Sequence, residues 1–146
     1  KVQHKIKIRK INLKFQPQYD TIVIDDTIDI LCPFYKPETK RRHIETSVIY
    51  RVSRDDFHEC RVGELAREVG RCNQPFDRTI LKIAFRRFQP NPYALEYRPN
   101  VTYYFISTSS GRPDGLENGI GGLCTSRALK MRIDVIGRDD VCPKRH

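Results

Sequence analysis

The sequence contains no tryptophan and a single methionine, and it has no long apolar run. No stretch approaches the roughly 18 consecutive apolar residues that a membrane-spanning helix needs. The chain also begins at Lys1 without the apolar segment of a signal peptide. We therefore expect that any targeting or anchoring segment has been removed from the chain.

Signatures of metal binding and of nucleophilic catalysis are missing as well. No C-x-x-C pair, no nearby His-x-x-x-His and no G-x-S-x-G elbow is present, which argues against a zinc site and a serine hydrolase. The histidines are scattered along the chain: His4, His43, His58 and His146. Blue copper needs two histidines, a cysteine and usually a methionine, yet no histidine lies near Cys124 or Met131. The sequence thus predicts no enzymatic activity, no metal site and no cofactor.

Two local clusters that resemble catalytic groups have simpler interpretations. His58 lies close to Cys60, but a disulfide explains this cysteine better than a thiol nucleophile. The acidic pairs 25–26 and 55–56 are adjacent in sequence, and adjacent residues on a strand face opposite ways. We interpret these carboxylates as solvated loop groups and His58 as a surface residue.

The chain of 146 residues suits one domain with a substantial core. Its cysteines are better explained by long-range disulfides, which argues for an oxidising compartment. The cysteines are Cys32, Cys60, Cys72, Cys124 and Cys142. Many arrangements of two bridges and one free thiol can be drawn from these five, and the sequence alone does not choose among them.

The formal net charge is +9, and many basic residues lie near the N-terminus. They alternate with apolar residues in the segment 5–8, which predicts a half-buried strand with a solvated basic face. We therefore expect no nucleic acid partner. Heparan sulfate is the alternative partner for this face.

Asn100, Val101 and Thr102 form a sequon for N-glycosylation. Asn100 follows Pro99 in a predicted turn, so we expect an exposed acceptor. Chance is the alternative explanation, because a three-residue pattern arises often.

Strand signals dominate the chain. Clusters rich in Ile, Val, Phe and Thr, separated by Pro, Gly, Asn and Asp, predict strands in these segments: 2–15, 21–31, 46–52, 79–88, 102–107 and 128–136. The first two are separated by a turn at 16–18. Met131 is expected in the core.

Helix is confined to short connections. Ser53 is a candidate N-cap for a short helix over 54–60, and 64–69 is predicted to be a helical turn that ends at Gly70. The segment 109–122 contains five glycines and is predicted to be a long loop. Many short strands with few helices indicate an all-β antiparallel sandwich or barrel.

Several motifs keep a characteristic order and spacing between residues 20 and 136. They read DTIDILCP at 26–33, YRVSRD at 50–55, CNQP at 72–75, FRRF at 85–88, YYFISTS at 103–109 and GGLC at 121–124. In this order they resemble the receptor-binding domain of the ephrins, cell-surface ligands that signal by contact. The stretch from Gly115 to Cys124 is most similar to class B ephrins, and the chain resembles a divergent, invertebrate-like member.

The resemblance implies a Greek-key β-barrel or sandwich of the cupredoxin type without copper, with short helices in the connections. It also implies the disulfides Cys32–Cys72 and Cys60–Cys124. Cys142 stands outside this pattern. It is a candidate for an interchain bridge, and so for self-association, or for a free thiol.

The same resemblance divides the chain into a receptor-binding domain, residues 1–137, and a stalk, residues 138–146. The stalk leads toward a GPI or single transmembrane anchor that is absent from this chain. The domain is expected at the extracellular face of the plasma membrane, where it is presented to a receptor on a neighbouring cell.

Ephrins insert one apolar loop into a hydrophobic channel of an Eph receptor, and the matching segment here is 88–97. The resemblance implies these receptor-binding residues: Gln89, Pro90, Asn91, Pro92, Tyr93, Ala94, Leu95 and Glu96. The two prolines restrict the backbone, so the loop loses little entropy on capture. Tyr93 and Leu95 are the expected apolar anchors. Phe88 and Tyr97, at the loop ends, are candidates for packing on their own domain.

The loop departs from the family pattern at Gln89, Tyr93 and Ala94. Ala94 stands where the family has glycine, and alanine is strained there if the backbone φ is positive. These changes leave room for a divergent partner. The alternative to an Eph receptor is another cell-surface receptor, or a heparan-type co-receptor that binds the basic face.

Overall fold

The structure, a computed structural model, describes residues 7–10 and 19–140. These residues form strands in two facing sheets, with short helices in the connections. The strands are β1 (Lys7–Lys10), β2 (Tyr19–Val23), β3 (Thr27–Leu31), β4 (Ser47–Val52), β5 (Arg67–Cys72), β6 (Ile80–Ala84), β7 (Val101–Ile106) and β8 (Lys130–Ile136). The helices are α1 (Arg54–Glu59) and α2 (Gly122–Arg127), and the 3₁₀ turns are η1 (Arg41–His43), η2 (Pro113–Gly115) and η3 (Arg138–Asp140).

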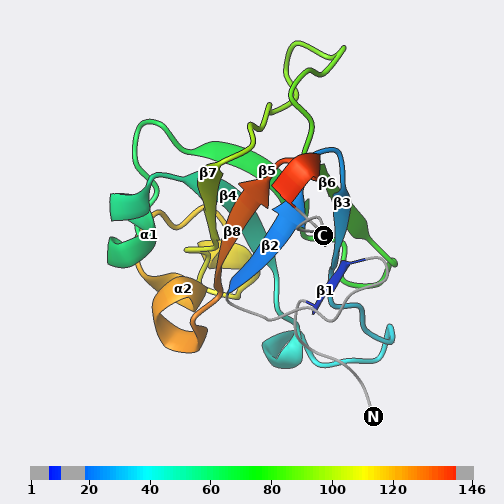
Figure 1. The fold of residues 1–146 in the computed structure, drawn as a ribbon. Coiled ribbons are helices and arrows are strands. Elements are labelled where there is room, and N and C mark those ends of the chain that lie inside the picture. The colour runs from blue at the N-terminus through cyan, green and yellow to red at the C-terminus, as the bar shows by residue number, and fades with distance from the viewer. Residues whose placement is uncertain (1–6, 11–18, 141–146) are drawn as a thin grey trace.

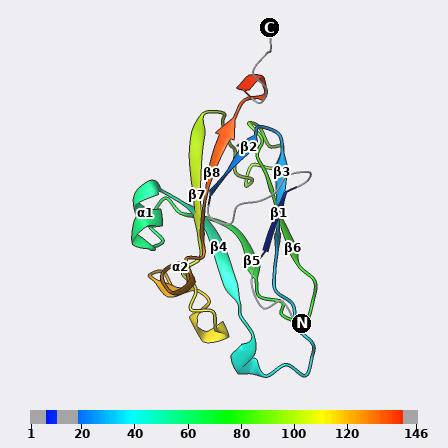
Figure 2. The same ribbon diagram turned by 60° about the horizontal axis from the view of Figure 1, so that its bottom comes forward.

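The described strands form a three-stranded sheet in the order β1-β3-β6 and a five-stranded sheet in the order β2-β8-β7-β4-β5. Paired strands are antiparallel except β2 and β8, which run parallel. Figures 1 and 2 show the two sheets face to face, with α1 and α2 on the outer side of the five-stranded sheet. The predicted all-β sandwich with short connecting helices is confirmed.

Apolar side chains from both sheets fill the space between them. In β8 the side chains alternate, so Met131, Ile133 and Val135 are buried while the residues between them are more exposed. Ile28 and Ile30 of β3 belong to the same buried cluster. Burial of each large aliphatic side chain contributes roughly 1.5–3 kcal/mol before the entropy cost of ordering it. Met131 lies in the core, as predicted.

Most of the remaining predicted strands correspond to observed ones. The segment 46–52 contains β4, 79–88 contains β6, 102–107 overlaps β7, and 128–136 contains β8. Residues 7–10 of the predicted first strand form β1, whereas the turn predicted at 16–18 lies outside the described residues. The predicted loop 109–122 includes η2 and runs into α2.

Helix α1 begins at the predicted cap, Ser53. The Ser53 Oγ accepts a hydrogen bond from the Asp56 amide at 3.2 Å, and the C-cap residue after Glu59, Cys60, has a left-handed φ of 50°. Asp56 itself is buried, and its carboxylate accepts hydrogen bonds from the Gly63 amide at 2.9 Å and from Arg61 at 2.8 Å. The interpretation of this carboxylate as a solvated loop group is therefore wrong, because the buried carboxylate binds the loop that follows α1 through these hydrogen bonds.

The prediction of a helical turn over 64–69 is also wrong. Residues 64–65 form a turn, and the chain then enters β5, which pairs with β4. Gly70 ends no helix. It lies where β5 passes β6, and a Cβ at this position would come within 2.8 Å of the Leu81 side chain. Pairing with a distant strand thus decides the conformation of a segment whose local preference is weak.

The segment 21–31, predicted to be one strand, forms two strands in different sheets. Strand β2 ends at Val23 and β3 begins at Thr27. Between them Asp25 adopts a left-handed φ of 78°, and its amide donates a hydrogen bond to the Phe85 carbonyl at 2.7 Å. The acidic pair 25–26 therefore makes the turn by which the chain crosses from one sheet to the other.

Gly122, at the start of α2, is closed in by backbone atoms. It has a φ of 54°, and a Cβ would lie 2.0 Å from the Thr108 carbonyl oxygen. Replacing Gly122 by alanine is expected to lower the free energy of unfolding by about 2 kcal/mol, because the backbone must shift and a left-handed φ strains alanine. Urea denaturation measures this loss. The matched control is Gly119→Ala, where nothing lies within 4 Å of a Cβ. Equal stability of the two variants would contradict the prediction.

Candidate functional site

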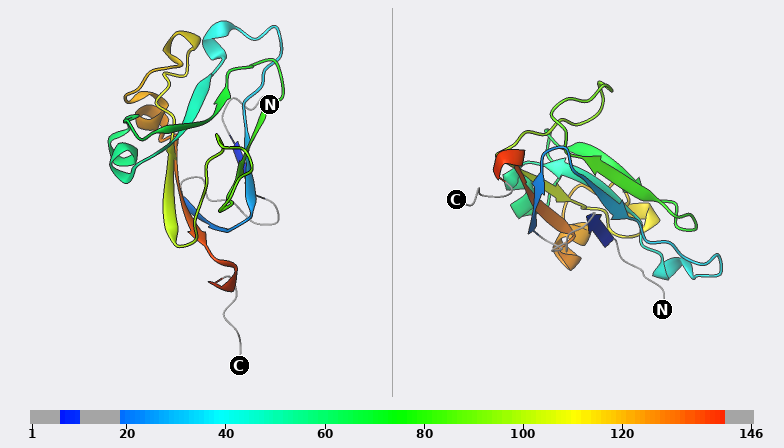
Figure 3. Two further views of the ribbon diagram at one scale, coloured as in Figure 1. Left: turned by 90° about the horizontal axis from the view of Figure 1, so that it is seen from above. Right: turned by 45° about the vertical axis from the view of Figure 1, so that its right-hand side comes forward.

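Residues 88–97, which we call the projecting loop, stand away from the sandwich between β6 and β7. Figure 1 shows them rising above one end of the sheets, and the right-hand view of Figure 3 shows the same projection from another side. The Tyr97 amide closes the base of the loop by donating to the Arg86 carbonyl at 2.9 Å. The candidate site is therefore a protrusion and not a cleft.

Asn91 organises the tip of the projecting loop. Its side-chain Oδ1 accepts a hydrogen bond from the Tyr93 amide at 3.0 Å, and its carbonyl accepts one from the Ala94 amide at 3.0 Å. Pro90 and Pro92 flank Asn91 and fix φ on either side of it. The described non-glycine residues with positive φ do not include Ala94. The strain considered for an alanine at this position is therefore absent.

The two most exposed aromatic side chains of the described residues both lie on the projecting loop. Tyr93 is 86% exposed and Phe88 is 81% exposed. Phe88 does not pack on its own domain, so the alternative that it does is wrong. Phe88 was expected at the loop end and not among the binding residues, and it is exposed beside them.

The other predicted binding residues differ in exposure. Leu95, the second expected anchor, is only partly exposed because it packs against the core. Gln89 and Ala94 are also half-buried, and the Gln89 Nε2 donates to the Ala84 carbonyl at 3.3 Å. The exposed members are Pro90, Asn91, Pro92, Tyr93 and Glu96. The apolar surface of the loop is thus made by two rings and two prolines more than by Leu95.

An aromatic cluster supports the base of the loop. The Tyr97 ring is 2% exposed, and its centroid lies 4.7 Å from those of both Phe85 and Tyr103. Tyr97 therefore packs on its own domain, as the sequence analysis considered for the residues at the loop ends. Burial raises the pKa of the Tyr97 phenol to about 12, and the nearby charge of Arg51 offsets part of that rise.

The raised pKa of Tyr97 predicts a loss of stability in alkali. Its pKa is 10.0 in the exposed reference state and about 12 in the fold, so the contribution is fully present below pH 10. As the pH rises from 10 to 12 the unfolded chain loses the proton first, and roughly 3 kcal/mol of stability is lost. Urea denaturation across this range measures the change. Tyr97→Phe keeps the ring without the phenol, and its stability should fall less steeply over the same range. Parallel pH profiles for the two proteins would contradict the prediction.

Two disulfides hold the framework behind the loop. Cys32 bonds Cys72, which ties the end of β3 in one sheet to the end of β5 in the other. Cys60 bonds Cys124, which ties the end of α1 to α2. These are the pairs that the resemblance implied. Cys142 lies outside the described residues.

The predicted sequon lies close to the base of the projecting loop. Asn100 is exposed and has a left-handed φ of 66°, and its amide donates to the Val135 carbonyl at 2.7 Å. The Thr102 hydroxyl donates to the Asp134 carboxylate at 2.7 Å. The Asn100 side chain is thus available to an enzyme that attaches a glycan, which stays a prediction.

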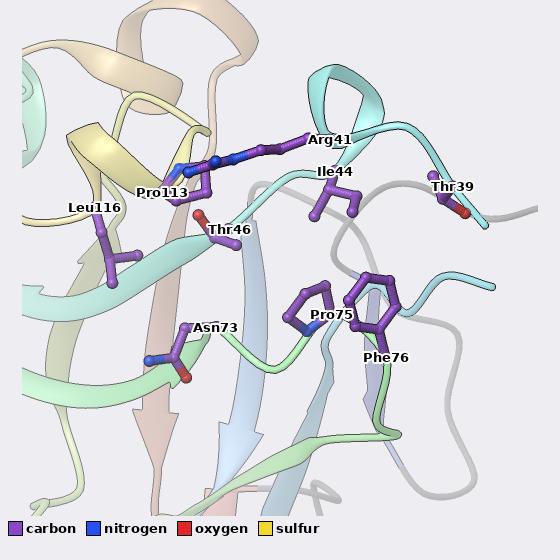
Figure 4. A pocket seen from close by; sticks show the side chains of 9 residues that line it. All are labelled: Thr39, Arg41, Ile44, Thr46, Asn73, Pro75, Phe76, Pro113 and Leu116. Atoms are coloured by element: carbon purple, nitrogen blue, oxygen red, sulfur yellow. The ribbon is translucent and has the colours of Figure 1, made fainter. Parts of the chain in front are cut away.

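Figure 1 places η1 at the end of the molecule away from the projecting loop, and a hollow of about 460 Å³ lies beside it. The lining residues are Thr39, Arg41, Ile44, Thr46, Asn73, Pro75, Phe76, Pro113 and Leu116. Figure 4 shows Arg41 reaching across toward Pro113. Among the described residues that line the hollow, Arg41 is the only titratable group, so no acid and base from this part of the chain converge there.

A second, more polar hollow near η1 gathers basic side chains. Arg42, His43, Arg112 and Arg127 line it, and Arg127 also pairs with Glu45 at 2.8 Å. The basic face predicted for the segment 5–8, where heparan sulfate is the alternative partner, lies largely outside the described residues and stays a prediction. Among the described residues, no group of three or more His, Cys, Asp or Glu side chains is arranged to hold a metal ion. No helix in the described ranges is long and apolar enough to cross a bilayer.

Comparison with known families and sequences gives a consistent result. A family model described as Ephrin matches residues 3–135. Ephrin-B1 of Xenopus laevis is 37% identical over 116 residues, which cover 80% of this chain and 34% of that protein. Ephrin-B2a of Danio rerio is 30% identical over 138 residues, 91% of this chain and 41% of that protein. Ephrin-4 of Caenorhabditis briggsae is 27% identical over 156 aligned positions, 92% of this chain and 43% of that protein.

The chain spans roughly a third to two fifths of the length of these relatives. Among solved structures, it is similar to a chain described under "Crystal structure of the human ephrin A2- ephrin A1 complex". The TM-score is 0.63 and the identity 22%, and the match covers 82% of this chain and 85% of that one. At that identity the likeness establishes the fold.

Proposed function

Since the chain belongs to the ephrin family, we propose that it is a ligand for Eph-type receptor tyrosine kinases and binds them through the projecting loop. The family consists of receptor-binding proteins and not of enzymes. The sandwich is the support, and the loop is the element that enters a hydrophobic channel of the receptor.

The observation that carries this proposal is the exposure of two aromatic rings on a restrained loop. Tyr93 and Phe88 are more than four-fifths exposed, and a folded protein gains nothing by leaving such rings in water. Buried in a partner, an aromatic anchor of this kind contributes roughly 2 kcal/mol or more to binding. The prolines and the Asn91 hydrogen bonds reduce the entropy cost of capture.

Ephrins are cell-surface, membrane-anchored ligands. For this chain we propose the following division into a domain and a stalk. Residues 1–137 form the receptor-binding domain and 138–146 a stalk toward a GPI or transmembrane anchor. Many anchored copies at a cell contact convert weak single bonds into avidity. Such contact signalling suits roles in cell guidance and adhesion.

Titration of the domain against a panel of Eph ectodomains tests the proposed function. We expect binding in the nanomolar range to at least one receptor, which corresponds to roughly 12 kcal/mol of binding free energy. Pro92→Gly, which frees the backbone at the loop tip, should weaken that binding. If the wild-type domain bound no receptor of the panel, the proposal would be overturned.

A further inference from the structure

Arg51 of β4 lies beneath the projecting loop and contacts its C-terminal leg. Its Nη1 donates a hydrogen bond to the Glu96 carbonyl at 3.0 Å. Its guanidinium also lies 4.9 Å from the centroid of the Tyr97 ring and 5.2 Å from that of Tyr103. One side chain of the five-stranded sheet therefore contacts both the loop and strand β7.

The position of Arg51 in the sheet makes these contacts its main stabilising interactions. Across β4 and β5 it pairs in register with Arg67, another cation. Like charges directly opposite each other destabilise a sheet. Among the described residues no carboxylate forms an ion pair with Arg51. The two ring faces, the Glu96 carbonyl and the Tyr97 phenol hold its guanidinium in place.

The C-terminal leg of the loop has few other restraints. Leu95 packs only partly on the core, and the Glu96 side chain is exposed. The Tyr97 amide holds the base by donating to the Arg86 carbonyl. Among the described residues, one further side chain, Arg51, donates a hydrogen bond to the backbone between that base and the Asn91 turn. Arg51 therefore holds the part of the loop that lies between its base and its tip.

From these contacts we infer that Arg51 is a positioning residue of the projecting loop: it need not touch the receptor and acts by holding the loop in its binding-competent shape. The inference rests on the proposed function of that loop. A ligand whose competent shape is only partly populated binds more weakly by that fraction. Loss of Arg51 thus lowers affinity by reducing the fraction of the domain whose loop has that shape.

The test compares Arg51→Met with Arg67→Met. Methionine keeps the unbranched stem and removes the guanidinium, and the control removes the same charge from the opposite strand, where the Arg67 side chain is exposed. Arg51→Lys keeps the charge but loses the planar fork, and serves as a second variant if methionine perturbs folding. Hydrogen exchange at the Ala94 and Tyr97 amides is measured in the free protein, and affinity for the Eph ectodomain panel in parallel.

We expect Arg51→Met to speed exchange at both amides and to weaken receptor binding, each about tenfold, with Arg51→Lys in between. Arg67→Met should match the wild type in both measurements, and exchange in the core strands should stay slow in all variants. Unchanged loop exchange in Arg51→Met overturns the inference, whether or not affinity falls. If wild type binds no receptor in the panel while loop exchange still accelerates, the proposed function fails and the positioning role is supported.

Discussion

Replacing Tyr93 by alanine is expected to weaken binding to an Eph ectodomain about 100-fold, roughly 3 kcal/mol. The Tyr93 ring is 86% exposed at the tip of the projecting loop, so its truncation removes no contact of the folded core. The free energy of unfolding should therefore stay the same. Surface plasmon resonance measures the affinity, and urea denaturation of the same sample measures the stability.

The control for this prediction is Leu65→Ala. Leu65 is 82% exposed in the connection before β5, so it is an equally free apolar side chain away from the loop. Its removal should leave the affinity as it is. Tyr93→Phe keeps the ring and should retain most of the binding. A result against the loop would be binding that survives Tyr93→Ala but collapses with added salt, which would favour the basic N-terminal face of the heparan alternative.

Removing the disulfide between Cys60 and Cys124 is expected to cost the domain about 4 kcal/mol of stability. The bridge spans 64 residues, and cutting it restores the conformational freedom of that span in the unfolded chain. Both cysteines are buried beside Val52 and Ile106, so the double replacement by alanine tests the crosslink with a small change in volume. Urea denaturation of the purified variant measures the loss.

Two comparisons sharpen the disulfide prediction. The pair Cys32–Cys72 spans 40 residues, so its double alanine variant should lose nearly as much stability, again about 4 kcal/mol. Cys142→Ala takes a cysteine from outside both described bridges and should leave stability unchanged. Loss of stability in Cys142→Ala, with little effect in the Cys60 and Cys124 double variant, would mean that the crosslinks join other cysteines.

Features with a local physical cause were predictable from the sequence. Ser53 ahead of an acidic turn predicts an N-cap, because its hydroxyl meets the free amides of the first helical turn wherever the helix lies. The apolar alternation around Met131 predicts a half-buried strand for a similar reason, since side chains alternate in any strand. Such features can be predicted without knowing which segments lie next to each other in the fold.

Features that depend on distant contacts were missed. Gly70 resembles a helix terminator in sequence, but its role is to let β5 pass the Leu81 side chain of β6. The turn at Asp25 is stabilised by the hydrogen bond that its amide donates to the carbonyl of Phe85, a residue far along the chain. Arg51 was part of a recognised motif, yet its contacts with Glu96 and Tyr97 exist only once β4 and the loop meet. Long-range pairing overrides weak local preference in each case.

The most direct test of the central claim is hydrogen exchange of the domain alone and in complex with an Eph ectodomain. We expect slower exchange in the complex across residues 88–95, where the two exposed rings and the prolines lie. Protection confined to the η1 end of the molecule, with the projecting loop exchanging as it does in the free protein, would contradict the account.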